Sequence, residues 1–186
     1  MGGFRDLVRF IDNTHALGTH LGDIKLANIL RNDQGIFSLI DQENASDVHT
    51  NPANIDWGTF TAEITTNALA RALNPHNREF ADRRAVLTIS DQYATLLSLM
   101  IITAARASRI RDIASAPHRV DVFGGPHPGI LNAEYRDALL PWVHTYIRPE
   151  CYGSIEALLT DPLDYVQNPQ YLPRLPLAQM IRWDAQ

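Results

Sequence analysis

The chain has 186 residues, 45% of which are apolar, and a formal net charge of −5 at pH 7. This length and composition indicate one globular domain, residues 1–186, with enough apolar residues for a sizeable core. The acidic balance and the scattered arginines argue against nucleic acid as a partner. With a single cysteine, Cys151, and no secretory leader, we expect a cytoplasmic protein without a disulfide and without a membrane partner.

The first two predicted elements are a helix and a hairpin. Apolar residues at helical spacing begin at Phe4, and Gly18 stands where a left-handed residue would end the helix. Two short apolar segments flank the turn-forming "NDQG" and predict a β-hairpin over residues 29–41. Antiparallel pairing would bring the polar ends of this hairpin, Asn28 and Asp41, close together.

The next segments predict a loop and two helices. Residues 42–60 lack periodicity and predict a long loop, whereas residues 61–73 have helical spacing. Ser90 is expected to cap a helix that runs through Asp91 to about Arg109 and is apolar nearly all round. An apolar run of this kind, too short to cross a bilayer, predicts a helix through the middle of the domain.

Shorter helices and a tail are predicted towards the end of the chain. "NAEYRDALL" and "PWVHTYI" predict two helices, with Pro141 at the start of the second, and Ser154 is expected to cap "IEALLT". Residues 162–186 carry four prolines and predict an extended C-terminal tail, either packed over the surface or partly mobile. The expected fold class is mainly α with a small β-hairpin, built around a buried central helix.

The segment "HLGDIKLANIL", residues 20–30, holds an unusual group of polar side chains. Asp23, Lys25 and Asn28 lie between two apolar runs, and Lys25 is the only lysine among 16 basic residues. Asp41 adds a second carboxylate from the hairpin. Hard oxygen ligands suit Mg²⁺, and a compact ammonium beside the metal would interact with a phosphoryl group in a way that a guanidinium would not. Taken alone, this spacing is also typical of a polar loop with a solvated ion pair.

"HLGDIKLANIL" followed by "IFSLID" resembles, in order and spacing, the catalytic loop and metal-binding strand of the eukaryotic-type protein kinases. The resemblance implies that Asp23 is the catalytic aspartate and that Lys25 contacts the transferred phosphate. It implies that Asn28 and Asp41 bind the metal, and that Mg²⁺ and ATP are the cofactors held by these two residues and Lys25. It further implies that Asp91, in the central helix, accepts hydrogen bonds from the backbone of the catalytic loop.

By this resemblance the chain corresponds to the large C-terminal lobe of a protein kinase, with the small lobe missing. Only fourteen residues precede His15, and no second lysine is present for the ATP-binding strand of a small lobe. Asp41 is followed by Gln42 and Glu43 instead of Phe and Gly, and no A-P-E motif is legible before Asp91. A partner would then have to supply the missing lobe.

The resemblance implies a protein kinase-like phosphotransferase, which moves the γ-phosphoryl of ATP to a Ser or Thr hydroxyl of a protein substrate. Two other functions fit the same residues. One is a degenerate kinase-fold module, a pseudokinase, which binds a regulatory protein or a nucleotide without turnover. The other is a phosphotransferase that acts on a small molecule. His15 and His20 have no Cys or third His positioned beside them, so we interpret them as structural residues and not as metal ligands.

Overall fold

The computed structural model describes residues 2–43, 45–47, 83–104, 109–115, 129–171 and 175–185. Within these ranges the protein is mainly helical, with two small antiparallel sheets. The expected mainly α class with a small β-hairpin is therefore confirmed. The helix predicted for residues 61–73 lies outside the described residues, as does most of the loop predicted for residues 42–60.

Helix α1 (Gly2–Ala16) forms as its apolar periodicity predicts. Its residues Phe4, Leu7, Val8 and Ile11 are all buried, because their spacing places them on one face. The helix ends where expected: Gly18 has a φ of 81°, and its N–H donates to the carbonyl of His15 at 2.9 Å. The left-handed conformation turns the chain directly into the segment that carries the candidate site.

The predicted hairpin is present as strands β2 (Ile29–Arg31) and β3 (Phe37–Leu39). Ile29 pairs with Leu39, and one further hydrogen bond, from Ile40 N–H to the carbonyl of Asn28 at 2.8 Å, extends the ladder towards the site. A second sheet, β1 (Thr19–His20) with β4 (Ser46–Asp47), was not predicted. Strands of two residues are too short to show an alternating pattern.

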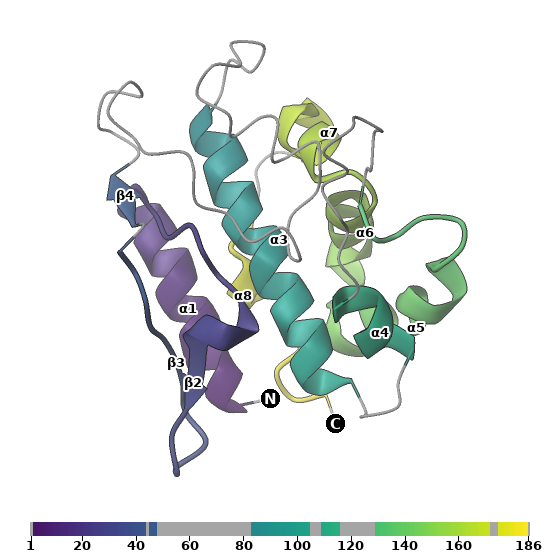
Figure 1. Ribbon diagram of the computed structural model, residues 1–186. Coiled ribbons are helices and arrows are strands. Elements are labelled where there is room, and N and C mark those ends of the chain that lie inside the picture. The colour runs from purple at the N-terminus through teal and green to yellow at the C-terminus, as the bar shows by residue number, and fades with distance from the viewer. Residues whose placement is uncertain are drawn as a thin grey trace, which may run out of the picture.

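Helix α3 (Arg83–Thr103) runs through the middle of the structure, with α1 on one side and α4–α7 on the other (Figure 1). The predicted cap at Ser90 is wrong, because this serine lies inside the helix. Val86, Leu87 and Ile89 are buried before it, so core packing extends the helix towards its N-terminus. The helix also ends earlier than expected, since Arg109 begins a separate helix, α4 (Arg109–Ser115).

The central helix is the one helix in the described ranges that is long and apolar enough to cross a membrane by length and composition. Of the stretch concerned, Arg84–Thr103, 83% is buried inside the protein. A buried core helix passes the same test, and α3 contacts α1, α4, α7 and β1. The expectation that this helix occupies the core is confirmed, while the cytoplasmic location stays a prediction.

Two predicted boundaries in the C-terminal half are wrong. Helix α5 (Arg136–Tyr146) is continuous, with Pro141 inside it, where two helices were expected. Leu139, Trp142 and Val143 are buried on both sides of that proline, and this burial offsets the lost hydrogen bond. The expected cap of the next helix also fails: α6 (Tyr152–Thr160) follows a 3₁₀ turn, η4 (Pro149–Cys151), so Ser154 lies inside α6.

The tail is helical and packed, so the prediction of an extended segment is wrong. It forms α7 (Pro162–Gln167), η5 (Pro169–Tyr171) and α8 (Leu177–Met180). Asp161 caps α7 by accepting hydrogen bonds from two backbone N–H groups, and Pro162 occupies the first turn, where a proline costs no hydrogen bond. Prolines therefore start these turns instead of keeping the chain extended.

Candidate functional site

The loop that carries the candidate site, residues 21–28, is fixed to the core by one carboxylate. Asp91, in α3, is fully buried. Its Oδ2 accepts a hydrogen bond from Leu21 N–H at 2.8 Å, and its Oδ1 accepts one from Gly22 N–H at 3.1 Å. The expectation that Asp91 binds the backbone of this loop is confirmed. Two backbone groups are thus held by a side chain seventy residues away in the chain.

Two histidines complete the surroundings of that carboxylate. His15 Nε2 lies 2.9 Å from Asp91 Oδ2, and His20 Nε2 lies 3.3 Å from Oδ1. Burial acts to raise the pKa of Asp91, but the two histidines outweigh it, so the pKa lies well below the ordinary value of 3.8. Both histidines are therefore structural, as interpreted from the sequence, and Asp91 remains an acceptor at neutral pH.

At the outer end of the loop, three of the four predicted site residues are in contact. Lys25 Nζ lies 2.5 Å from Asp23 Oδ2. Asn28 Nδ2 donates to the carbonyl of Asp23 at 3.0 Å and approaches its Oδ2 at 3.2 Å. Ile24 between them is fully buried, so it anchors the loop while its neighbours face outwards. The side chains of Asp23 and Lys25 retain 13% and 31% exposure, which leaves both accessible to a substrate.

The amide of Asn28 has a defined orientation. Its nitrogen is directed at Asp23, while no hydrogen bond to its oxygen comes from the part of the chain that the structure describes. Asn28 is nearly buried, at 5% exposure, so its position is set by packing as well. Its Oδ1 is thus the atom left for a ligand from solution.

Asp41, the fourth residue, lies at the far end of the hairpin and is exposed. The bond from Ile40 N–H to the carbonyl of Asn28 places Asp41 next to Asn28 across the strand pair, as predicted. Its φ of 58° makes it the one non-glycine residue with a positive φ among the described residues. Backbone in this region is disfavoured for residues other than glycine, and such positions concentrate at functional sites.

The oxygen atoms of Asn28 and Asp41 fit Mg²⁺ in kind and in number. No group of three or more His, Cys, Asp or Glu within the described ranges is close enough to hold a metal ion. Mg²⁺ does not need such a cage, because it takes one or two carboxylates and completes its shell with water and phosphate oxygens. The site would therefore bind the metal together with a phosphate and only weakly without one.

Three exposed apolar side chains lie along the outer face of the hairpin, from Ile40 beside Asp41 to Ile36 near the turn. Leu30, Ile36 and Ile40 are 53%, 40% and 41% exposed, and strand alternation places them on the face opposite Phe37, which packs on α1. An exposed apolar face beside potential metal ligands is a surface that a planar base or a covering polypeptide would bury.

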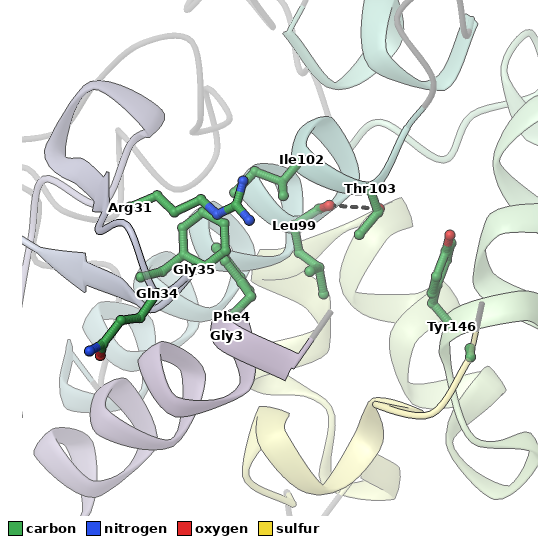
Figure 2. Close-up of a pocket in the computed structure, with 11 residues that line it drawn as sticks. Gly3, Phe4, Arg31, Gln34, Gly35, Leu99, Ile102, Thr103 and Tyr146 are labelled. Carbon is green, nitrogen blue, oxygen red and sulfur yellow. Dashed lines mark hydrogen bonds between the residues drawn. The ribbon is translucent and has the colours of Figure 1, made fainter.

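A hollow of about 590 Å³ lies at the other end of the hairpin, between the start of α1 and the end of α3. Figure 2 shows Arg31 reaching over it towards Ile102, with Phe4 and Leu99 below and Tyr146 on the far side. None of the four site residues lines it. The candidate site is thus an open surface at the loop and not this hollow.

The contacts of Asp91 with the loop backbone were expected from the sequence, but the use of the histidines was missed, and the functional assignment of the four site residues stays a prediction. His15 ends α1 and His20 lies in β1, so helix and strand bring both imidazoles to one carboxylate. The available signal was the expected burial of Asp91, because a buried carboxylate needs cationic or hydrogen-bonding partners nearby.

No family model, no curated protein and no solved structure matches the chain.

Proposed function

We propose that this protein is a protein kinase-like phosphotransferase, which transfers the γ-phosphoryl of Mg-ATP to a Ser or Thr hydroxyl of a protein. One observation carries the proposal: Asp23, Lys25 and Asn28 form a hydrogen-bonded group on a loop whose backbone Asp91 holds, beside Asp41. A solvated ion pair in an ordinary polar loop would not require a buried anchor of this kind.

In this proposal each side chain has one task. Asp23 orients the attacking hydroxyl and accepts its proton on a carboxylate oxygen, while the new bond from the hydroxyl oxygen to the γ-phosphorus forms and the bond to the bridging oxygen of the departing ADP breaks. Asn28 fixes Asp23 through its Nδ2, and Lys25 Nζ, 2.5 Å from Asp23, is placed to balance negative charge on the transferred group. Bound Mg²⁺, held by Asn28 Oδ1 and Asp41, would supply positive charge to the phosphate oxygens.

The part that covers ATP would come from elsewhere in this proposal. Lys25 is the only lysine in the chain and is engaged with Asp23, so no second lysine remains to hold the α- and β-phosphates of ATP. The exposed apolar face formed by Leu30, Ile36 and Ile40 gives such a cover a surface to bury. This exposed apolar face also favours the second candidate, a kinase-fold module that binds a protein or nucleotide without turnover.

The proposal is tested by incubating the protein with γ-labelled ATP, MgCl₂ and a Ser/Thr peptide library. We expect label on peptide, with a loss of about 100-fold or more in Asp41→Ala and in Lys25→Arg. Glu43→Ala removes an exposed carboxylate two residues from Asp41 and serves as the matched control. Stabilisation by Mg-ATP without transfer would favour the binding module, and label on a small acceptor alone would favour the small-molecule enzyme. Absence of both stabilisation and label transfer would refute nucleotide binding and phosphotransfer by this chain alone.

A further inference from the structure

A second hollow, away from the loop, carries an unusual group of arginines. It has a volume of about 440 Å³ and lies between α1, α8 and the connection after α5. It is lined by charged residues of both signs, by polar residues and by apolar residues: Arg5, Arg9, Arg148, Asp12, Asn13, Gln179, Trp183, Ala16, Pro176 and Ala178. We call it the arginine groove. None of its residues belongs to the four-residue site, so a ligand bound in the groove would be independent of the proposed function.

The three guanidinium groups come from two parts of the fold. Arg5 and Arg9 are four residues apart on the exposed side of α1, where this spacing places side chains on one face. Arg148 follows α5, and its position is fixed because its backbone N–H donates to the carbonyl of Met180 at 2.9 Å. All three side chains are exposed.

These arginines have no acidic partners among the residues that the structure describes. The ion pairs found there involve Asp91, Asp23 and Glu156 as the acids, and none lies in the groove. The one carboxylate in the lining, Asp12, is engaged elsewhere: its oxygens accept hydrogen bonds from Leu177 N–H at 3.1 Å and Ala178 N–H at 2.7 Å. With three guanidinium groups and one carboxylate, the lining of the groove carries a net positive charge in a protein of net charge −5.

Part of the remaining wall is apolar, and Asn13 and Gln179 add polar side chains to it. Trp183 donates its indole N–H to the carbonyl of Ala178 at 2.8 Å, which holds the ring in place beside α8. Ala16 and Pro176 line the hollow as well. A ligand with an anionic group and a short organic stem would thus meet guanidinium groups at one end and apolar atoms at the other.

We propose that the arginine groove binds a phosphate monoester carried on a polypeptide, such as a phosphorylated Ser or Thr side chain. A phosphate monoester has close to two negative charges and three acceptor oxygens, which several guanidinium forks can bind at once. A carboxylate offers one charge and two oxygens. Nucleic acid fits less well, because it requires an extended basic stripe, whereas this positive surface is confined to one short groove.

The test uses a fluorescein-labelled nine-residue peptide of glycine and alanine with a central phosphoserine, and the same peptide with serine or glutamate there. By fluorescence anisotropy, we expect the phosphopeptide to bind at least 10-fold more tightly than either. Arg5→Gln/Arg9→Gln and Arg148→Gln should each weaken binding at least 10-fold, and binding should fall with added salt. The matched control, Arg84→Gln/Arg136→Gln, removes two exposed arginines outside the groove and should leave binding unchanged.

Two kinds of result would overturn the proposal. The first kind is a failure of selectivity. It would be seen if the phosphopeptide did not bind, if the three peptides bound equally, or if the groove variants and the control lost the same affinity for the phosphopeptide. The other is a single-stranded RNA that binds more tightly than the phosphopeptide and loses affinity in the same groove variants. Thermal unfolding of every variant verifies that the exposed substitutions leave the fold intact. The indole N–H resonance of Trp183 in the NMR spectrum gives an independent readout. It should shift when the phosphopeptide is added and not when the serine or glutamate peptide is added.

Discussion

At its inner end the loop 21–28 is held by Asp91, which is fully buried and has two backbone N–H groups and two histidines as partners. At its outer end, Asp41 is exposed, and none of the described residues bonds to its carboxylate. Both residues are aspartates beside the same loop. The site thus combines a loop that is rigidly attached to the core with a carboxylate that stays accessible to solvent.

The difference between Asp91 and Asp41 separates a contribution to the stability of the fold from a contribution to ligand binding. A sequence motif does not distinguish the two. Losing the partners of a buried carboxylate is costly, because the groups left behind stay desolvated. Losing an exposed carboxylate costs little stability, because its charge is solvated in both the folded and the unfolded state. Substitutions at the inner end should therefore change the stability of the fold, whereas substitutions at the outer end should change ligand binding.

Replacing Asp91 by alanine should have the largest effect on folding. It leaves Leu21 N–H and Gly22 N–H without acceptors and two histidines facing a cavity, so we expect a loss of about 3–5 kcal/mol in the free energy of unfolding. Urea denaturation measures it. Asp112→Ala, at an exposed position in α4, is the control and should change stability by less than about 0.5 kcal/mol. Equal effects in the two variants would contradict the anchoring role.

Acid should weaken the same anchor. The pKa of Asp91 in the folded protein lies below its ordinary value of 3.8, so its stabilising contribution is fully present above that value. The contribution decreases as the pH falls below 3.8 towards the folded-state pKa. Urea denaturation between pH 5 and pH 3 should therefore show the stability difference between wild type and Asp91→Asn becoming smaller. A difference that grew on acidification would have the wrong sign for this account.

The hairpin that carries Asp41 is held to α1 by a close backbone contact. A Cβ atom at Gly3 would lie 1.9 Å from the carbonyl oxygen of Gly35, so Gly3→Ala should separate the two elements and cost about 1–3 kcal/mol. At Gly153, in α6, no atom lies within 4 Å of an added Cβ. Gly153→Ala should thus be neutral or slightly stabilising. Thermal unfolding compares the two, and a neutral Gly3→Ala would place the hairpin further from α1.

Features of the fold that depend on a local sequence pattern could be predicted, whereas features that depend on tertiary packing could not. The helix end at Gly18 and the proximity of Asn28 and Asp41 were predicted because each depends on a local pattern or a short hairpin. The anchor at Asp91 joins residues seventy apart in the chain, and it was expected only from the family resemblance. The pairing of β1 with β4 was missed, since it joins two-residue strands. The continuous helix through Pro141 was missed because the burial of Trp142 and its neighbours outweighs a local breaker, which only the tertiary structure shows.

Asp41→Ala should have the smallest effect on folding, within about 0.5 kcal/mol, because the carboxylate is exposed. Alanine brings no relief of the positive φ, because aspartate tolerates this region at least as well as alanine does. Chemical denaturation without ligand measures this effect. A large loss of stability would show that Asp41, like Asp91, has a structural role and would remove the contrast between the two ends of the loop.

The most direct test of that contrast is the thermal shift that Mg-ATP produces in wild type, Asp41→Ala and Glu43→Ala. We predict that the melting temperature of wild type and Glu43→Ala rises with Mg-ATP, that Mg²⁺ alone has a smaller effect, and that Asp41→Ala does not respond. The same shift in all three proteins, or no shift in wild type, would contradict the assignment of the loop and Asp41 as a magnesium and phosphate site.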